Sequence, residues 1–148
     1  ECGVGEIGEI LRVARWRKSD SNTLWMREGD SDQRFGSVID GRVEVSVDGQ
    51  RVSEVSYGEV FGELAYLDEQ DHKHMYTVVT TTTTTYLELN PAALSLATDE
   101  CQDAFRRRLV TVVARRLGSA YRELAKTGAP AERITASGFG MELQLLDN

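Results

Sequence analysis

The chain has 148 residues, 41% apolar and 28% charged, which suffices for one domain with a packed core and argues against disorder over its whole length. Its formal net charge of −7 argues against binding to nucleic acid or to an anionic membrane, and no apolar run reaches the roughly 18 residues of a membrane-spanning helix. Two cysteines indicate neither a disulfide framework nor a clustered zinc site, so we expect reduced thiols and a cytoplasmic location. Because the chain begins at Glu1 and not at Met, we expect it to be part of a longer protein.

The N-terminal segment and the segment that follows it differ in periodicity. Apolar residues within 7–14 recur at helical spacing and predict a short amphipathic helix, which a polar run over 15–22 follows. From 23 to 89 the period becomes two: within 43–47, for example, valines alternate with charged or polar residues as in a half-buried strand. Several short strands separated by glycine-containing turns predict a sandwich or barrel and not alternating β-α-β units.

Two features of this β region are specific enough to locate. Asp48-Gly49 lies between two strand-like segments and predicts a tight hairpin, because such a turn needs positive φ at its centre. The segment 77–89 contains six consecutive threonines, Thr80 to Thr85, whose β-branched side chains favour a strand. We interpret that run as a solvated strand face with no chemical role.

The C-terminal third is predicted to be helical. Asn90-Pro91 is typical of an N-cap followed by proline in the first turn, so a short helix is expected over 92–97. Apolar residues at a 3–4 spacing then predict a long amphipathic helix over 101–126, which Gly128 and Pro130 end. We therefore divide the chain into a main domain, 1–127, and a tail, 128–148, whose alternating residues 141–145 could add an edge strand.

The most informative motif lies at 57–67 and reads Tyr-Gly-Glu-Val-Phe-Gly-Glu-Leu-Ala-Tyr-Leu. Its glycines allow close backbone approach, and Gly62-Glu63 predicts the start of a short helix, whose free N–H groups suit an anion while a glutamate suits a sugar hydroxyl. The motif resembles the phosphate-binding cassette of the cyclic nucleotide-binding domain family. Arg27-Glu28-Gly29-Asp30 and the glycine-led strand that starts at Gly41 extend the resemblance to roughly residues 7–126.

This resemblance implies a mainly β fold, an eight-stranded antiparallel β-roll of jelly-roll type with an N-terminal helix and a long C-terminal helix. It also implies that the cassette faces the ligand, with Glu63 on the ribose 2′-hydroxyl. In the family an arginine shortly after the cassette pairs with the cyclic phosphate, but here no arginine lies between Arg51 and Arg106, and His74 stands at or near that position beside Lys73. The candidate ligand-binding residues are Phe61, Gly62, Glu63, Leu64, Ala65, Lys73, His74 and Thr77.

The missing arginine predicts weak or lost nucleotide binding. Neither histidine nor lysine offers the planar, bidentate fork that suits a phosphate, and loss of one partner of a desolvated charge pair costs about 2–5 kcal/mol. Five acidic residues between 59 and 71 have no base among them, and the loop 68–76 is longer than usual. That loop places Met75 and Tyr76 where small residues are common, so their bulk is expected to fill the pocket.

These features predict a non-catalytic regulatory domain of a larger signalling protein, for which we name a bacterial serine/threonine kinase as the effector. Cyclic AMP or cyclic GMP is the ligand that the resemblance implies, with a rescue of binding by Lys73 or His74 as one hypothesis. The alternative is a docking or dimerisation domain with no small ligand, which uses the long helix for a homodimer. His72 and His74 lack a third ligand, and no hydrolase signature occurs, so neither a metal nor an enzyme is predicted.

Overall fold

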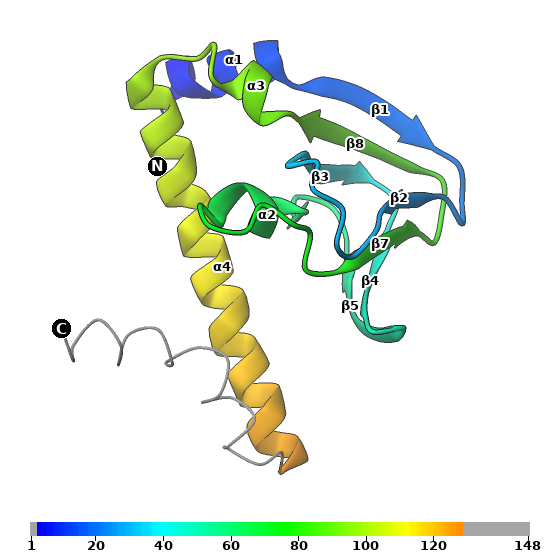
Figure 1. Ribbon diagram of the computed structural model, residues 1–148. Coiled ribbons are helices and arrows are strands. Elements are labelled where there is room, and N and C mark those ends of the chain that lie inside the picture. The colour runs from blue at the N-terminus through cyan, green and yellow to red at the C-terminus, as the bar shows by residue number, and fades with distance from the viewer. Residues whose placement is uncertain (1–2, 129–148) are drawn as a thin grey trace, which may run out of the picture. The chain divides into compact units, whose positions relative to one another are not determined.

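The computed structural model describes residues 3–128 and has the predicted β-roll, with one helix before it and a long helix after it (Figure 1). Eight strands form two antiparallel four-stranded sheets, in the orders β1-β8-β3-β6 and β2-β7-β4-β5. The strands are β1 (Arg15–Ser19), β2 (Leu24–Met26), β3 (Phe35–Asp40), β4 (Val43–Val47), β5 (Gln50–Val55), β6 (Val60–Phe61), β7 (Thr77–Thr80) and β8 (Thr84–Leu89). The helices are α1 (Val4–Val13), α2 (Glu63–Leu67), α3 (Pro91–Leu94) and α4 (Asp99–Thr127).

The chain forms two compact units, Glu1–Val110 and Thr111–Asn148. The first contains the β-roll, the short helices and the start of α4, and the described part of the second is the rest of α4 up to Gly128. The predicted edge strand at 141–145 lies outside the described residues. No helix in the described part of the chain is long and apolar enough to cross a membrane.

The predicted hairpin is confirmed. β4 and β5 pair antiparallel around Asp48-Gly49, with Val47 opposite Gln50 and φ values of 50° and 76° at the two turn residues. Positive φ at both positions is the turn geometry whose twist matches the strands, and glycine adopts it without steric cost. The sequence therefore fixes this register locally.

One strand was not expected. The polar run after the first helix contains β1, which pairs along its length with β8, from Arg15 opposite Glu88 to Ser19 opposite Thr84. Four of its five residues are exposed, so the strand has no apolar alternation that a sequence pattern could reveal. Its backbone pairing with β8 holds it in place.

The interpretation of the threonine run as a solvated face is wrong for two of its members. The chain turns at 81–83 between β7 and β8, and Thr80 and Thr84 on either side are 1% and 0% exposed. The Thr80 hydroxyl donates to the Asp20 carbonyl at 2.6 Å, and Thr84 Oγ1 lies 3.1 Å from the Arg42 carbonyl. The buried hydroxyl groups of these two threonines are thereby satisfied by loop carbonyls.

The helical predictions hold with small shifts of boundary. The Asn90 side chain accepts a hydrogen bond from the Ala92 amide at 2.9 Å and caps α3, which ends at Leu94. α4 extends two residues earlier than predicted, from Asp99. Near its start, Leu109 is buried in a cluster that joins the helices to the β-roll, together with Phe35, Leu89 and Leu94.

Candidate functional site

The cassette turns at Gly62, between β6 and α2. Gly62 has φ 81° and ψ −2° and is the N-cap of the five-residue helix Glu63–Leu67. A Cβ at this position would lie 3.0 Å from the Arg34 carbonyl oxygen and 3.2 Å from both Phe35 Cα and the Trp25 ring. Both the positive φ and the close approach of a neighbouring strand therefore require glycine here, as the sequence predicted.

Glu63 and Tyr76 meet at the first turn of α2. Glu63 is only 1% exposed although it carries a carboxylate, and the Tyr76 hydroxyl donates to its Oε2 at 3.0 Å. The same hydroxyl accepts a hydrogen bond from the Gly62 amide at 2.7 Å. Tyr76 thus bonds both a backbone N–H and a carboxylate of the cassette, which are the two kinds of group that a sugar phosphate would use.

The two bulky residues that were expected to fill the pocket, Met75 and Tyr76, lie in different surroundings. Tyr76 is half-buried and packs against the core between the sheets, with its hydroxyl in the cassette. Met75 is 49% exposed, so of the two residues only Tyr76 is shown packed against the core.

His74, which the resemblance in sequence places at or near the position of an arginine, is paired with an acid. Its side chain is 0% exposed, and Nε2 lies 2.8 Å from Asp32 Oδ1 in the loop between β2 and β3. An ionised carboxylate can only accept a hydrogen bond, so the N–H group of this pair is His74 Nε2–H and Asp32 is the acceptor. In the described part of the chain, His74 Nδ1 is buried without a hydrogen-bond partner.

The other predicted ligand-binding residues lie in different surroundings. Phe61 is 0% exposed in the core and meets the Trp25 ring edge-on at 4.6 Å. Ala65 is buried in α2, and Leu64 beside it is half-buried. Thr77 Oγ1 accepts from the Glu28 amide at 3.1 Å, whereas Lys73 is exposed. The structure thus brings the Gly62 amide and the Glu63 carboxylate together at the Tyr76 hydroxyl, while Phe61 is a core residue.

Sequence reasoning missed a row of charged groups beside the cassette. Arg34 Nε lies 3.3 Å from Asp32, Arg34 Nη1 lies 3.4 Å from Glu88, and the guanidinium stacks 4.4 Å from the Trp25 ring centroid. Asp32 in turn bonds His74, so the contacts run from β8 to the loop before β7. These residues are far apart in the sequence, and no local motif marks them.

The acidic stretch after α2 is partly compensated. Arg106 of α4 lies 3.3 Å from Glu69 and stacks 5.0 Å from the Tyr66 ring centroid. The backbone N–H groups of Gln70 and Asp71 donate to the Asp68 carboxylate and hold its pKa below the ordinary value, with a minor contribution from the charge of His72. Within the described residues, no group of three or more acidic, histidine or cysteine side chains is arranged to hold a metal ion.

Comparison with known proteins settles which family this cassette represents. Residues 16–98 match the family model of the cyclic nucleotide-binding domain, which is more than half of the chain. The chain belongs to the cyclic nucleotide-binding domain family. The segment after 98, which includes α4, lies beyond the matched region.

Curated and solved relatives are consistent with this assignment. The chain is 27% identical over 113 residues to the Pycsar effector protein XpPycTIR of Xanthomonas perforans, an alignment that covers 76% of this chain and 37% of that protein. A cyclic nucleotide-binding domain from Methylobacillus flagellatus is similar in fold, with a TM-score of 0.78, 16% identity, and coverage of 86% of this chain and 75% of that one. The catabolite activator protein of Thermus thermophilus gives a TM-score of 0.66 at 24% identity and covers 85% of this chain and 60% of that one.

Proposed function

We propose that this chain is the regulatory domain of a larger signalling protein and that it binds a cyclic nucleotide with weakened affinity. The family match supports the ligand class and a role that is not itself catalytic. The chain spans little more than a third of its curated relative, a Pycsar effector protein. This relative supports a role as one part of a larger protein of that kind and does not favour attachment to a serine/threonine kinase. A cytoplasmic location stays a prediction from composition.

The buried Glu63 carries this proposal. Burial of a carboxylate is costly unless hydrogen-bond donors approach it, and Glu63 is held at the first turn of α2 with the Tyr76 hydroxyl as a donor. A ribose 2′-hydroxyl is a donor of the same kind. We infer that Glu63 accepts a hydrogen bond from the ribose, and that the ligand shares or displaces the Tyr76 hydroxyl.

The phosphate half of the site explains the weakened affinity. An arginine would contribute a bidentate pair to the cyclic phosphate, but His74 is fully buried and already donates to Asp32. Lys73 is exposed and flexible, so it can approach a phosphate only at the cost of side-chain entropy. The proposed ligand is therefore held chiefly through its ribose and through backbone N–H groups of the cassette.

Isothermal titration with the cyclic 3′,5′-monophosphates of adenosine, guanosine, cytidine and uridine tests the proposal. We expect saturable binding of at least one of them, weakened about tenfold or more by Glu63→Gln, which removes a charge-assisted hydrogen bond. Glu59→Gln is the matched control, because Glu59 is an exposed acid of the same motif. No saturable heat with any of the four up to millimolar concentration would contradict nucleotide binding.

A docking domain is the second candidate, and one observation favours it. In the second compact unit, α4 exposes Leu117, Tyr121 and Leu124 by 51%, 41% and 36%. Their spacing of four and three residues places them on one face of the helix, which suits a helix from a second copy of this chain. Sedimentation equilibrium tests it: a dimer that Leu117→Ser dissociates would support the homodimer, and a monomer at all concentrations would contradict it.

A further inference from the structure

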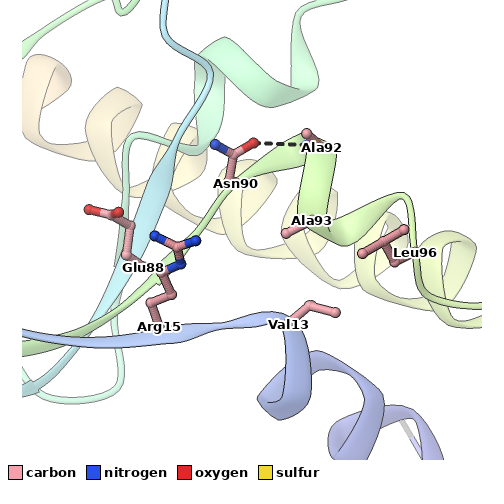
Figure 2. Close-up of a pocket in the computed structure, with 7 residues that line it drawn as sticks. All are labelled: Val13, Arg15, Glu88, Asn90, Ala92, Ala93 and Leu96. Atoms are coloured by element: carbon pink, nitrogen blue, oxygen red, sulfur yellow. Dashed lines mark hydrogen bonds between the residues drawn. The ribbon is translucent and has the colours of Figure 1, made fainter.

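A pocket of about 350 Å³ lies away from the cassette, where α1, β1, β8 and α3 meet (Figure 2). This volume is within the range of about 300–1,000 Å³ that is typical of small-molecule sites. None of its lining residues belongs to the cassette motif. They are Val13, Arg15, Glu88, Asn90, Ala92, Ala93 and Leu96.

The pocket carries an uncompensated positive charge. Within the described residues, the Arg15 guanidinium has no ion-pair or hydrogen-bond partner, although Arg15 lies opposite Glu88 in the paired strands. Glu88 is engaged elsewhere, since its carboxylate lies 3.7 Å from Arg17 and 3.4 Å from Arg34. Two arginines therefore already balance that acid, and Arg15 remains available to an anion.

Asn90 adds a second donor at the same end. Its Oδ1 is committed to the Ala92 amide, which leaves the two N–H bonds of its side-chain amide for other acceptors. In Figure 2 the amide nitrogen points away from Ala92, on the side where the Arg15 guanidinium lies. A guanidinium and an amide that share one end of a pocket suit the oxygens of a carboxylate or a phosphate.

The opposite end of the pocket is apolar. Val13 and Ala93 are half-buried, and Leu96 is 81% exposed although it is a large apolar side chain. Figure 2 shows these three side chains together, separated from the guanidinium by the width of the pocket. A short apolar group bound there would cover Leu96 and remove apolar surface from water.

We propose that this pocket binds a small organic anion, with its carboxylate or phosphate on Arg15 and Asn90 and a short apolar body against Val13, Ala93 and Leu96. The site is independent of the cassette and does not require nucleotide binding. It lies on α3, directly before α4 in the chain, so a bound anion would stabilise the junction of these helices.

NMR titration of the ¹⁵N-labelled chain tests the proposal with defined probes. Hexanoate and hexyl phosphate carry the two anionic head groups on the same apolar body, and their relative affinities distinguish a carboxylate site from a phosphate site. Hexylammonium has the same body with the opposite charge. We expect saturable shifts of the Ala92 and Ala93 amides and of the Asn90 side-chain amide with at least one of the anions and none with hexylammonium.

Two variants separate the pocket from general charge effects. Arg15→Gln should weaken binding of the anion about tenfold or more, because it removes a charged donor from the site. Arg12→Gln changes the net charge equally on exposed α1 and should leave the affinity within about twofold. Three results would overturn the proposal: no saturable shift with either anion, equal binding of hexylammonium, or unchanged affinity in Arg15→Gln.

Discussion

Removal of the Tyr76 hydroxyl should have opposite effects on stability and on ligand affinity. Tyr76→Phe keeps the ring that packs against the core and removes only the oxygen that bonds Gly62 and Glu63. If the hydroxyl holds the groups that the ribose needs, its loss frees them for the ligand. The same loss leaves a buried amide and a buried carboxylate less well satisfied in the absence of ligand.

The magnitudes follow from the two hydrogen bonds. A hydrogen bond to a neutral group contributes about 0.5–1.5 kcal/mol and one to a charged group about 1.5–3 kcal/mol, so Tyr76→Phe should lower the free energy of unfolding by about 2–4 kcal/mol. The ligand no longer has to displace the bond to Glu63, so its affinity should rise by about tenfold or more. Against a typical domain stability of about 5–15 kcal/mol, the variant should still fold.

Urea denaturation of the wild type and of Tyr76→Phe measures the free energy of unfolding, and isothermal titration of the same two proteins measures the affinity for the cyclic nucleotide. We expect the variant to unfold at a lower urea concentration and to bind the cyclic nucleotide more tightly. A variant that is less stable and also binds more weakly would refute the reasoning, because Tyr76 would then be a ligand contact and not a competitor for Glu63. Tyr57→Phe, which removes the hydroxyl of a tyrosine that is 78% exposed, is the matched control and should change neither quantity.

Three further predictions concern the surroundings of this site. His74→Ala should lower the free energy of unfolding by about 2–3 kcal/mol and Lys73→Ala by less than about 0.5 kcal/mol, measured by urea denaturation, because only His74 is buried and bonded to an acid. Gly62→Ala should cost about 2–5 kcal/mol and Gly58→Ala about 1–2 kcal/mol by the same assay, since both have positive φ but only Gly62 is crowded. In carboxyl ¹³C NMR the pKa of Asp68 should lie below its ordinary value, and an unshifted pKa would contradict the backbone hydrogen bonds to its carboxylate. The contribution of this carboxylate to stability is complete above the unfolded-state pKa and is lost as the pH falls through the folded-state pKa.

Local patterns were sufficient for several elements. The hairpin at Asp48-Gly49, the Asn90 cap and the long helix α4 all depend on residues within a few positions of one another. The turn at Gly62 is a further local feature, because a glycine directly before a short helical segment can be recognised in the sequence. Such features are set by backbone geometry and can be predicted without knowledge of the remaining chain.

Other features depend on residues that are distant in the sequence. β1 is a strand because it pairs with β8. The buried hydroxyl of Thr84 donates a hydrogen bond to the Arg42 carbonyl in the loop before β4. The pairing of His74 with Asp32 spans 42 positions and converts a predicted ligand contact into a structural link. Sequence periodicity carries no record of such contacts, so these parts of the site could be identified only in the folded molecule.

The central claim is that Glu63 accepts a hydrogen bond from the ribose 2′-hydroxyl of a cyclic nucleotide. Its most direct test is a double cycle of titrations that compares the best-binding cyclic nucleotide with its 2′-deoxy analogue, on the wild-type chain and on Glu63→Gln. We predict that the 2′-deoxy analogue binds about tenfold or more weakly to the wild type and that this difference falls to within about twofold in the variant. Equal affinity of the two nucleotides for the wild type would contradict the claim.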